Sequence, residues 1–470
     1  MMRLAFPLLF VVLLTGWCSE WTQFRGPNGS GVSGAKGLPV EFGPAKNVLW
    51  KTALPAGHST PVFTPDRIFL TGFDSEGKLW TFCLNREDGK VLWRREAPRP
   101  RRQELHKSNS PASPSAVTDG RNAYVFFTDF GLLSYGPDGE ERWRMPLGPF
   151  NNPFGMGASP VLAGNTLLQI CDSESGSFFA AYDKDTGKLK WRVERPDVAR
   201  GFSTPVLYQP KDGEQQVIVP GSYRLVAYSV ATGERLWWTS GLTWQLKPTP
   251  VMDGERIYVL GWAGGSDTGQ QEEIAPFDDV LKTWDANKDG VLAKAEVPDL
   301  KILKDWSSVD LDRDDLLGSR DWQMYRDRRA AQNGLTAFRL GGRGDMTGKS
   351  IVWRYTKSLP NVPSPLLYDG VIYLAKEGGL FTSIDPANGE VLKQGRLQGA
   401  LDQYFASPVA ADGRVYVASQ SGHVVVLKAG AQWEVLGVNT FDDEIHSTPV
   451  PLGNRLYIRT RSALYALGTP

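Results

Sequence analysis

The sequence predicts an all-β protein, an eight-bladed β-propeller closed by an N-terminal strand, on three observations. The 470-residue chain is rich in turn-forming and aromatic residues, with 50 glycines, 32 prolines and 16 tryptophans. A strand–turn–strand motif recurs along the chain. Its spacing of about 45 residues, with about four short strands in each unit, is typical of a propeller blade.

The strand–turn–strand motif consists of a strand, a tight turn at a glycine and a second strand that ends near a tryptophan. It is clearest at 83–96, 181–194 and 227–240. The glycine supplies the positive φ that a short hairpin needs, and the tryptophan is large enough to wedge between neighbouring sheets. The repeat tryptophans are Trp50, Trp93, Trp143, Trp191, Trp237 and Trp353, while two later units carry Lys393 and Leu436 near this place.

A second element, Ser or Thr followed by Pro and an alternating apolar strand, precedes each copy of the motif. The period of two is that of a β-strand. Together the elements define seven complete units at 58–98, 109–147, 155–196, 201–241, 245–358, 361–400 and 403–443.

An eighth unit at 446–468 ends before its last strand. Residues 47–55 resemble the missing strand, and their addition would close the ring and hide both sheet edges. Seven blades is the alternative. We therefore expect a propeller over 47–263 and 333–470, an N-terminal extension over 19–46 and an insert over 264–332.

The insert over 264–332 lies in blade five, where the step from Trp237 to Trp353 exceeds one repeat. It contains a loop that matches a helix–loop–helix (EF-hand) calcium site, with oxygen ligands at loop positions 1, 3, 5, 7 and 12. These ligands are Asp285, Asn287, Asp289, the Val291 carbonyl and Glu296. The alternative is an acidic surface loop.

A second loop at 310–321 follows, close enough to pair with the first. Its ligands would be Asp310, Asp312, Asp314, the Leu316 carbonyl and Asp321. It departs from the calcium pattern because Asp315 stands where glycine is usual, and Asp321 is shorter than the usual Glu. We expect bound calcium with a structural role.

Residues 1–18 have one arginine and an apolar run that is too short to span a bilayer, which is typical of a signal peptide. Cleavage after Cys18 would send the protein to the periplasm or the medium. A lipid anchor at Cys18 is the alternative, which the bulky Trp17 disfavours. Cys83 and Cys171 fall in non-adjacent units, so we expect both to be buried free thiols.

The net charge of the chain gives no support for a nucleic-acid or anionic-lipid partner. The 52 basic and 52 acidic groups balance, so nothing attracts nucleic acid or anionic lipid in general. No later segment is apolar and long enough to cross a membrane.

The pattern A-x-D-x-x-T-G-K-x-x-W resembles the repeat of PQQ-type β-propellers, and the resemblance covers about 47–470 apart from the insert. Its residues are Ala181, Asp183, Thr186, Gly187, Lys188 and Trp191. Residues 21–31 and 174–196 also look like exported propellers of planctomycete-type bacteria. The resemblance implies either a quinoprotein dehydrogenase, with pyrroloquinoline quinone and calcium, or a cofactor-free scaffold such as the propeller lipoprotein of the outer-membrane assembly machine.

The chain departs from the dehydrogenases of this family. Quinoprotein alcohol dehydrogenases carry two adjacent cysteines, and no two cysteines are adjacent here. No motif matches their calcium ligands or catalytic Asp.

Three of the four histidines fall near the start of an innermost strand. His58 and His446 directly precede the Ser/Thr-Pro element, and His106 lies four residues before it. We expect them at one mouth of the channel, with Asn109, Ser59 and Ser110, as a metal or anion site. The alternative is a set of polar residues that cap strand ends.

We therefore expect an exported, calcium-binding, non-catalytic scaffold that binds a protein or polysaccharide through this mouth. A quinone-dependent oxidoreductase is the second hypothesis, and a metal-dependent enzyme that uses the histidines is the third.

Overall fold

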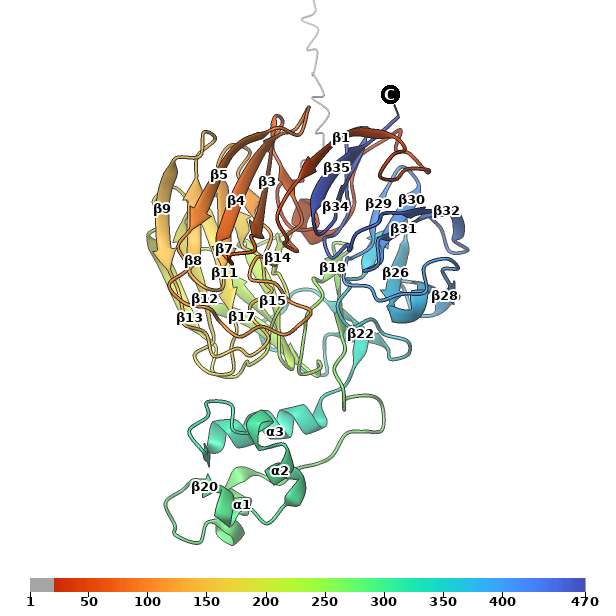
Figure 1. Cartoon of the computed structure of the whole chain (residues 1–470). Coiled ribbons are helices and arrows are strands. Elements are labelled where there is room, and N and C mark those ends of the chain that lie inside the picture. The colour runs from red at the N-terminus through yellow and green to blue at the C-terminus, as the bar shows by residue number, and fades with distance from the viewer. Residues whose placement is uncertain (1–20, 470) are drawn as a thin grey trace, which may run out of the picture.

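A computed structural model describes residues 21–469 of the chain. The predicted signal peptide and the Cys18 anchor lie outside the described residues. Eight sheets of four or five strands stand as blades around a central axis (Figure 1). This arrangement confirms the predicted all-β, eight-bladed propeller.

The strands of the first four blades follow the chain from the axis outwards. Blade 1 is β2 (Val62–Phe63), β3 (Arg67–Phe73), β4 (Leu79–Asn85) and β5 (Val91–Ala97). Blade 2 is β6 (Val117–Thr118), β7 (Ala123–Phe127), β8 (Gly131–Tyr135) and β9 (Glu141–Pro146). Blade 3 is β10 (Val161–Ala163), β11 (Thr166–Cys171), β12 (Phe178–Asp183) and β13 (Leu189–Glu194). Blade 4 is β14 (Val206–Tyr208), β15 (Gln216–Gly221), β16 (Arg224–Ser229) and β17 (Arg235–Ser240), with β23 (Gly344–Asp345) added in parallel to β17.

The last four blades repeat this order. Blade 5 is β18 (Val251–Met252), β19 (Arg256–Gly261), β22 (Gly334–Arg339) and β24 (Ile351–Tyr355). Blade 6 is β25 (Leu366–Tyr368), β26 (Val371–Lys376), β27 (Leu380–Ile384) and β28 (Val391–Arg396), with a 3-10 turn at Glu377–Gly379. Blade 7 is β29 (Val409–Ala411), β30 (Arg414–Ala418), β31 (His423–Lys428) and β32 (Glu434–Thr440). Blade 8 is β33 (Val450–Leu452), β34 (Arg455–Arg459), β35 (Ala463–Leu467) and β1 (Val48–Ala53).

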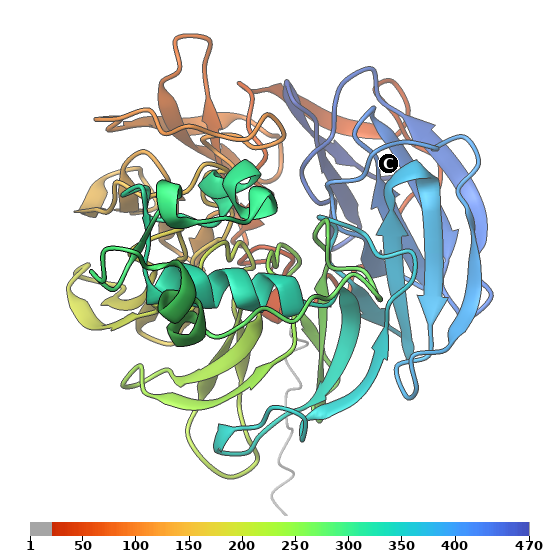
Figure 2. The same cartoon turned by 90° about the horizontal axis from the view of Figure 1, so that it is seen from below.

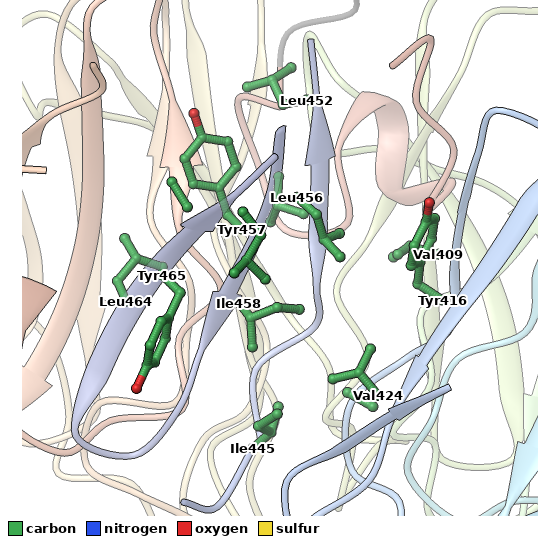
Figure 3. Packing of buried hydrophobic residues seen from close by; sticks show 14 of the residues in the cluster. Val409, Tyr416, Val424, Ile445, Leu452, Leu456, Tyr457, Ile458, Leu464 and Tyr465 are labelled. Carbon is green, nitrogen blue, oxygen red and sulfur yellow. The ribbon is translucent and has the colours of Figure 1, made fainter. Parts of the chain in front are cut away.

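The N-terminal strand β1 closes the ring, as predicted. It pairs antiparallel with β35, with Lys51 opposite Tyr465. The strands that close the ring pack on a large apolar core, whose residues come from blades 7, 8 and 1 and from the N-terminal segment. Figure 3 shows part of this core, in which Leu456 and Ile458 of blade 8 and Val409 and Val424 of blade 7 are buried.

Five of the six repeat tryptophans wedge against a turn glycine of the next blade, whereas Trp237 donates to Gln216 Oε1 within its own blade. A Cβ on Gly187 would lie 2.7 Å from the Trp143 ring, and Gly187 has φ 71°. Trp143 Nε1 also donates to the Lys184 carbonyl, 2.9 Å away. The glycine is therefore required twice, for the turn and for the tryptophan. The same contact joins Trp50 to Gly89, Trp93 to Gly139, Trp191 to Gly233 and Trp353 to Gly389.

The Ser/Thr of the Ser/Thr-Pro element ties neighbouring blades together around the axis. Its hydroxyl accepts a hydrogen bond from the backbone N–H of the equivalent residue in the preceding blade of the ring, as for Thr60 N to Ser115 Oγ at 2.8 Å. In blade 2 the equivalent residue is Ser115, which is followed by Ala116 and not by Pro. The same bond runs through Thr249, Ser364, Ser407, Thr448, Thr60, Ser115, Ser159 and Thr204 in turn. Ser203 Oγ completes the circle by donating to the Pro248 carbonyl.

The N-terminal extension closes one end of the central channel. The Trp21 and Thr22 carbonyls accept from Phe63 N and Thr118 N, at the far ends of two innermost strands. Asn28, in a 3-10 turn at Pro27–Gly29, exchanges two hydrogen bonds of 2.8 Å with the Leu207 backbone. The extension is thus a plug whose neighbours belong to several blades.

The helical insert lies between β19 and β22. It holds α1 (Phe277–Trp284), α2 (Leu300–Lys304), α3 (Ser319–Ala330), 3-10 turns at Lys294–Glu296 and Trp306–Ser308, and the short strands β20 (Leu292–Ala293) and β21 (Leu316–Leu317). Because strands alternate in direction, the β19–β22 connection lies at the end of the channel where innermost strands begin, opposite the plug. Figure 1 shows the insert below this end, and Figure 2, seen from below, shows it in front of the blades.

Two further expectations concern thiols and membranes. Cys83 and Cys171 are free and buried, as predicted, and burial raises the pKa of Cys83 to about 12. Within residues 21–469, no helix combines the length and apolarity needed to cross a bilayer.

Candidate binding pocket and calcium loops

The channel is a blind pocket of about 350 Å³ because the N-terminal plug closes one end. Phe24 of the plug lines it, although no sequence pattern predicts a role for this residue. Cavities of this size bind small molecules. The pocket therefore depends on a segment outside the repeat.

The repeat supplies most of the remaining lining. In every blade, the residue two positions before the tying Ser or Thr lines the pocket. These residues are His58, Ser113, Gly157, Phe202, Lys247, Val362, Phe405 and His446. The register of the Ser/Thr-Pro element is thus the sequence signal for the pocket.

The predicted histidines all line this pocket, but their nitrogens do not converge. His58 and His446 stack face to face, with ring centroids 4.1 Å apart and planes 5° apart. His106 lies against Phe154 instead, at 5.9 Å. Among residues 21–469, the grouping of side chains that could hold a metal ion is Asp310, Asp312 and Asp314, and it includes no histidine.

The stacked histidines are poor cations. Burial, together with the neighbouring His446, Arg459 and Arg461, lowers the pKa of His58 to about 3. Burial also lowers the pKa of His446. Both rings are therefore neutral at pH 7, which favours stacking over anion binding.

The other residues predicted at the mouth divide into two groups. Asn109 lines the pocket, donates to the Phe154 carbonyl and accepts from Ser113 Oγ at 2.6 Å. Ser59 is fully buried and bonds to the Thr71 backbone, so it does not line the pocket. Ser110 is also buried and lines an adjoining cavity of about 680 Å³.

In the insert, the second loop brings three carboxylates together. One ligand oxygen from each of Asp310, Asp312 and Asp314 lies within 4.8 Å of the others. Burial raises the pKa of Asp312, and Asp314 and Asp310 raise it further by repulsion. Calcium prefers such a set of hard oxygens.

The first loop holds its carboxylates on backbone N–H groups. Glu296 accepts from Ala286 N and Asn287 N through one oxygen and from Ala293 N through the other. Asp285 accepts from Lys288 N at 2.7 Å and from Gly290 N at 3.0 Å. The side chains at positions 1 and 12 thus point into the loop.

The two loops have matching backbones despite their different sequences. Positive φ occurs at position 4 in both, at Lys288 and Arg313, and at position 6 in both, at Gly290 and Asp315. The departure at Asp315 therefore leaves the loop conformation intact, because Asp tolerates this region. The loops also pair at position 8, with Leu292 opposite Leu317 in the β20–β21 ribbon.

The second loop also docks the insert on blades 3 and 4. Asn151 Nδ2 donates to the Leu311 carbonyl at 2.9 Å. Arg320 Nη2 donates to the Glu174 carbonyl at 2.7 Å, and Tyr223 OH to the Met324 carbonyl at 3.2 Å.

The buried Glu174 carboxylate joins the dock to the pocket wall. It pairs with Arg200 and lies 3.7 Å from Arg313 of the second loop. The Arg200 guanidinium lies over the rings of Phe154, a pocket residue, and Trp244, at 5.2 and 5.1 Å. A continuous set of contacts therefore runs from the second loop to the pocket.

Comparisons with known proteins agree with this fold. The chain matches the sequence profile of a family described as outer membrane protein assembly factor BamB, over residues 42–175, 83–275 and 308–468. A search of curated proteins found no match.

Several solved structures share the architecture. BamB from Moraxella catarrhalis is 13% identical, with a TM-score of 0.56 over 89% of this chain and 98% of that chain. A europium-containing methanol dehydrogenase is 10% identical, with a TM-score of 0.59 over 96% and 98%. Quinohemoprotein alcohol dehydrogenase from Comamonas testosteroni is 11% identical, with a TM-score of 0.58 over 96% and 81%. Identities this low show the fold alone.

Proposed function

The chain belongs to the family described as outer membrane protein assembly factor BamB, and from this membership we propose that it is an exported, non-catalytic scaffold. It binds a protein or polysaccharide partner at the end of the channel where the pocket and the insert meet. Calcium in the insert loops stabilises this end. The balanced charge gives no support for a nucleic-acid partner.

The observation that carries this proposal is the lining of the pocket. No Asp or Glu is among the described residues that line it. Calcium held beside a quinone takes hard oxygen ligands, foremost carboxylates, whereas the oxygens that line this pocket belong to amide and hydroxyl side chains such as Asn109, Gln245 and Asn361. The residues present therefore do not fit a quinone–calcium pair, and we derive no reaction step through one.

The calcium assignment is supported by the geometry of the insert. Both loops turn at the same positions, their ribbon pairs at position 8, and the second loop gathers three carboxylates. The ligands predicted from the sequence are Asp285, Asn287, Asp289, Val291 and Glu296 in the first loop, and Asp310, Asp312, Asp314, Leu316 and Asp321 in the second. Calcium outside cells is plentiful, so a structural role fits export.

The test is a titration of calcium-loaded protein with pyrroloquinoline quinone, followed by absorbance and by dye reduction with alcohols and sugars. We expect neither binding nor turnover from protein that is folded by circular dichroism. Tight binding with turnover would overturn the scaffold proposal and identify a dehydrogenase.

A further inference from the structure

Lys247 places a cation in the pocket without a carboxylate beside it. It lies between β17 and β18, two residues before Thr249. Its Nζ donates to Gln245 Oε1 and Asn361 Oδ1, both at 2.9 Å. Within residues 21–469, no charged partner of this ammonium is found, and burial alone lowers the pKa of Lys247 to about 8.

Among residues 21–469, the Lys247 ammonium finds two acceptors, which leaves one of its hydrogen-bond donors unused. An ammonium offers three N–H donors, and the two amide oxygens take two of them. No Asp or Glu lines the pocket, so no negatively charged side chain there would repel an anion. His58 and His446 are neutral at pH 7, so the attraction would come from Lys247. Attraction between opposite charges is stronger in such a site than in water.

The walls of the pocket are aromatic. Phe154 meets Phe202 edge-on, with centroids 6.1 Å apart. Phe405 stacks on His446 at 5.2 Å. Phe24 lines the same space from the plug. Such walls favour a ligand with a flat or apolar body over a hydrated inorganic ion.

We infer that the pocket binds a small organic acid, whose carboxylate accepts a hydrogen bond from Lys247 and whose body lies against Phe154, Phe202 and Phe405. One cation matches one carboxylate, whereas a phosphate dianion would leave charge unpaired. This inference rests on the proposed binding function and names its ligand class. The acid is either a free aromatic acid or the acidic sugar of a polysaccharide.

Calorimetry at pH 7 tests the inference with phenylacetate and glucuronate, which represent the two sources, and with phenylacetamide and glucuronamide as uncharged controls. We expect at least one acid to bind and its amide to bind at least tenfold more weakly. Which acid binds distinguishes an aromatic acid from an acidic sugar.

Two variants locate the contact. Lys247→Met keeps a side chain of similar length without its charge and should weaken binding of the acid at least tenfold. Lys107→Met removes a lysine that lines only the adjoining cavity and should leave the affinity unchanged. The amide comparison needs no variant, so it stands even where Lys247→Met fails to fold.

The inference is overturned where neither acid binds, where acid and amide bind equally, or where folded Lys247→Met binds the acid like the parent. If any of these outcomes is found and the quinone titration shows no turnover, the scaffold proposal stands without this ligand. Quinone turnover would instead remove the scaffold proposal itself.

Discussion

The propeller and its insert are held together by different means. Adjacent blades are joined by a repeated pair of contacts, a tryptophan on a glycine and a backbone N–H on a hydroxyl, as in Trp143 on Gly187 and Thr60 on Ser115. The insert has its own apolar core around Leu292 and Trp322. It reaches the ring through a few polar side chains and a small apolar cluster that includes Met324 and Tyr223. The ring should therefore keep its stability when the insert loses its order, whereas the insert depends on its loops.

The largest expected effect is in the ring. Trp143→Ala removes a buried aromatic side chain together with its hydrogen bond to the Lys184 carbonyl, so we expect a loss of about 3–5 kcal/mol in the free energy of unfolding. Urea denaturation followed by far-UV circular dichroism measures it. Leu300→Ala, at a side chain that is 79% exposed in the insert, is the control and should change stability by no more than about 0.5 kcal/mol. A small effect of Trp143→Ala would show that the wedge does not hold the blades.

Next in size is the loss of calcium. Asp285→Ala with Glu296→Ala should lower the number of bound calcium ions measured by calorimetry. It should also remove the stabilisation that calcium gives the insert, about 2.7 kcal/mol at a concentration 100 times the dissociation constant.

Asp310→Ala with Asp321→Ala is the matched change in the second loop. Because Leu311 and Arg313 contact the ring from that loop, we expect only this pair to loosen the dock. Equal effects of the two pairs on the dock would contradict the difference between the loops. An unchanged calcium count and melting temperature in both would refute the calcium assignment.

A smaller effect should depend on pH. The pKa of His58 falls from 6.5 to about 3 on folding, so the unfolded chain binds the extra proton between these values and acid destabilises the fold. We expect the ring to lose about 1 kcal/mol between pH 6.5 and 5.5 from this group. Thermal melts of parent and His58→Gln across this range measure it, and a steeper slope in the variant would be the opposite of this expectation.

The smallest expected effect is at the dock. Tyr223→Phe removes the hydrogen bond from the ring to the Met324 carbonyl, which costs about 0.5–1.5 kcal/mol. Faster amide exchange in α3 with unchanged exchange in blade 4 would show the effect. Unchanged exchange in both would mean that this bond does not hold the insert.

Sequence periodicity predicted the ring because the contacts that build it repeat. The number of blades, the closing strand and the wedged tryptophans all follow from spacing. The pocket was predicted through the type of residue, histidine, rather than through register, so Phe202 and Lys247 were missed although each stands two positions before the tying Ser or Thr.

Other parts of the site leave no local pattern. Phe24 lies in a segment without a repeat, so only the folded chain places it in the channel. Arg320 meets the Glu174 carbonyl across 146 residues of sequence, and no local pattern predicts such a contact. The sequence of the second loop departs from the calcium pattern at Asp315, yet the backbone there adopts a positive φ, as at Gly290.

The most direct test of the central claim, that calcium serves the insert and not the ring, is hydrogen exchange with and without calcium. We predict that chelation deprotects 277–330 and the docking residues near Asn151 and Glu174, while the innermost strands and the pocket keep their protection. Loss of protection around the channel would place calcium in the ring, as a quinone-dependent enzyme would need, and would contradict the account.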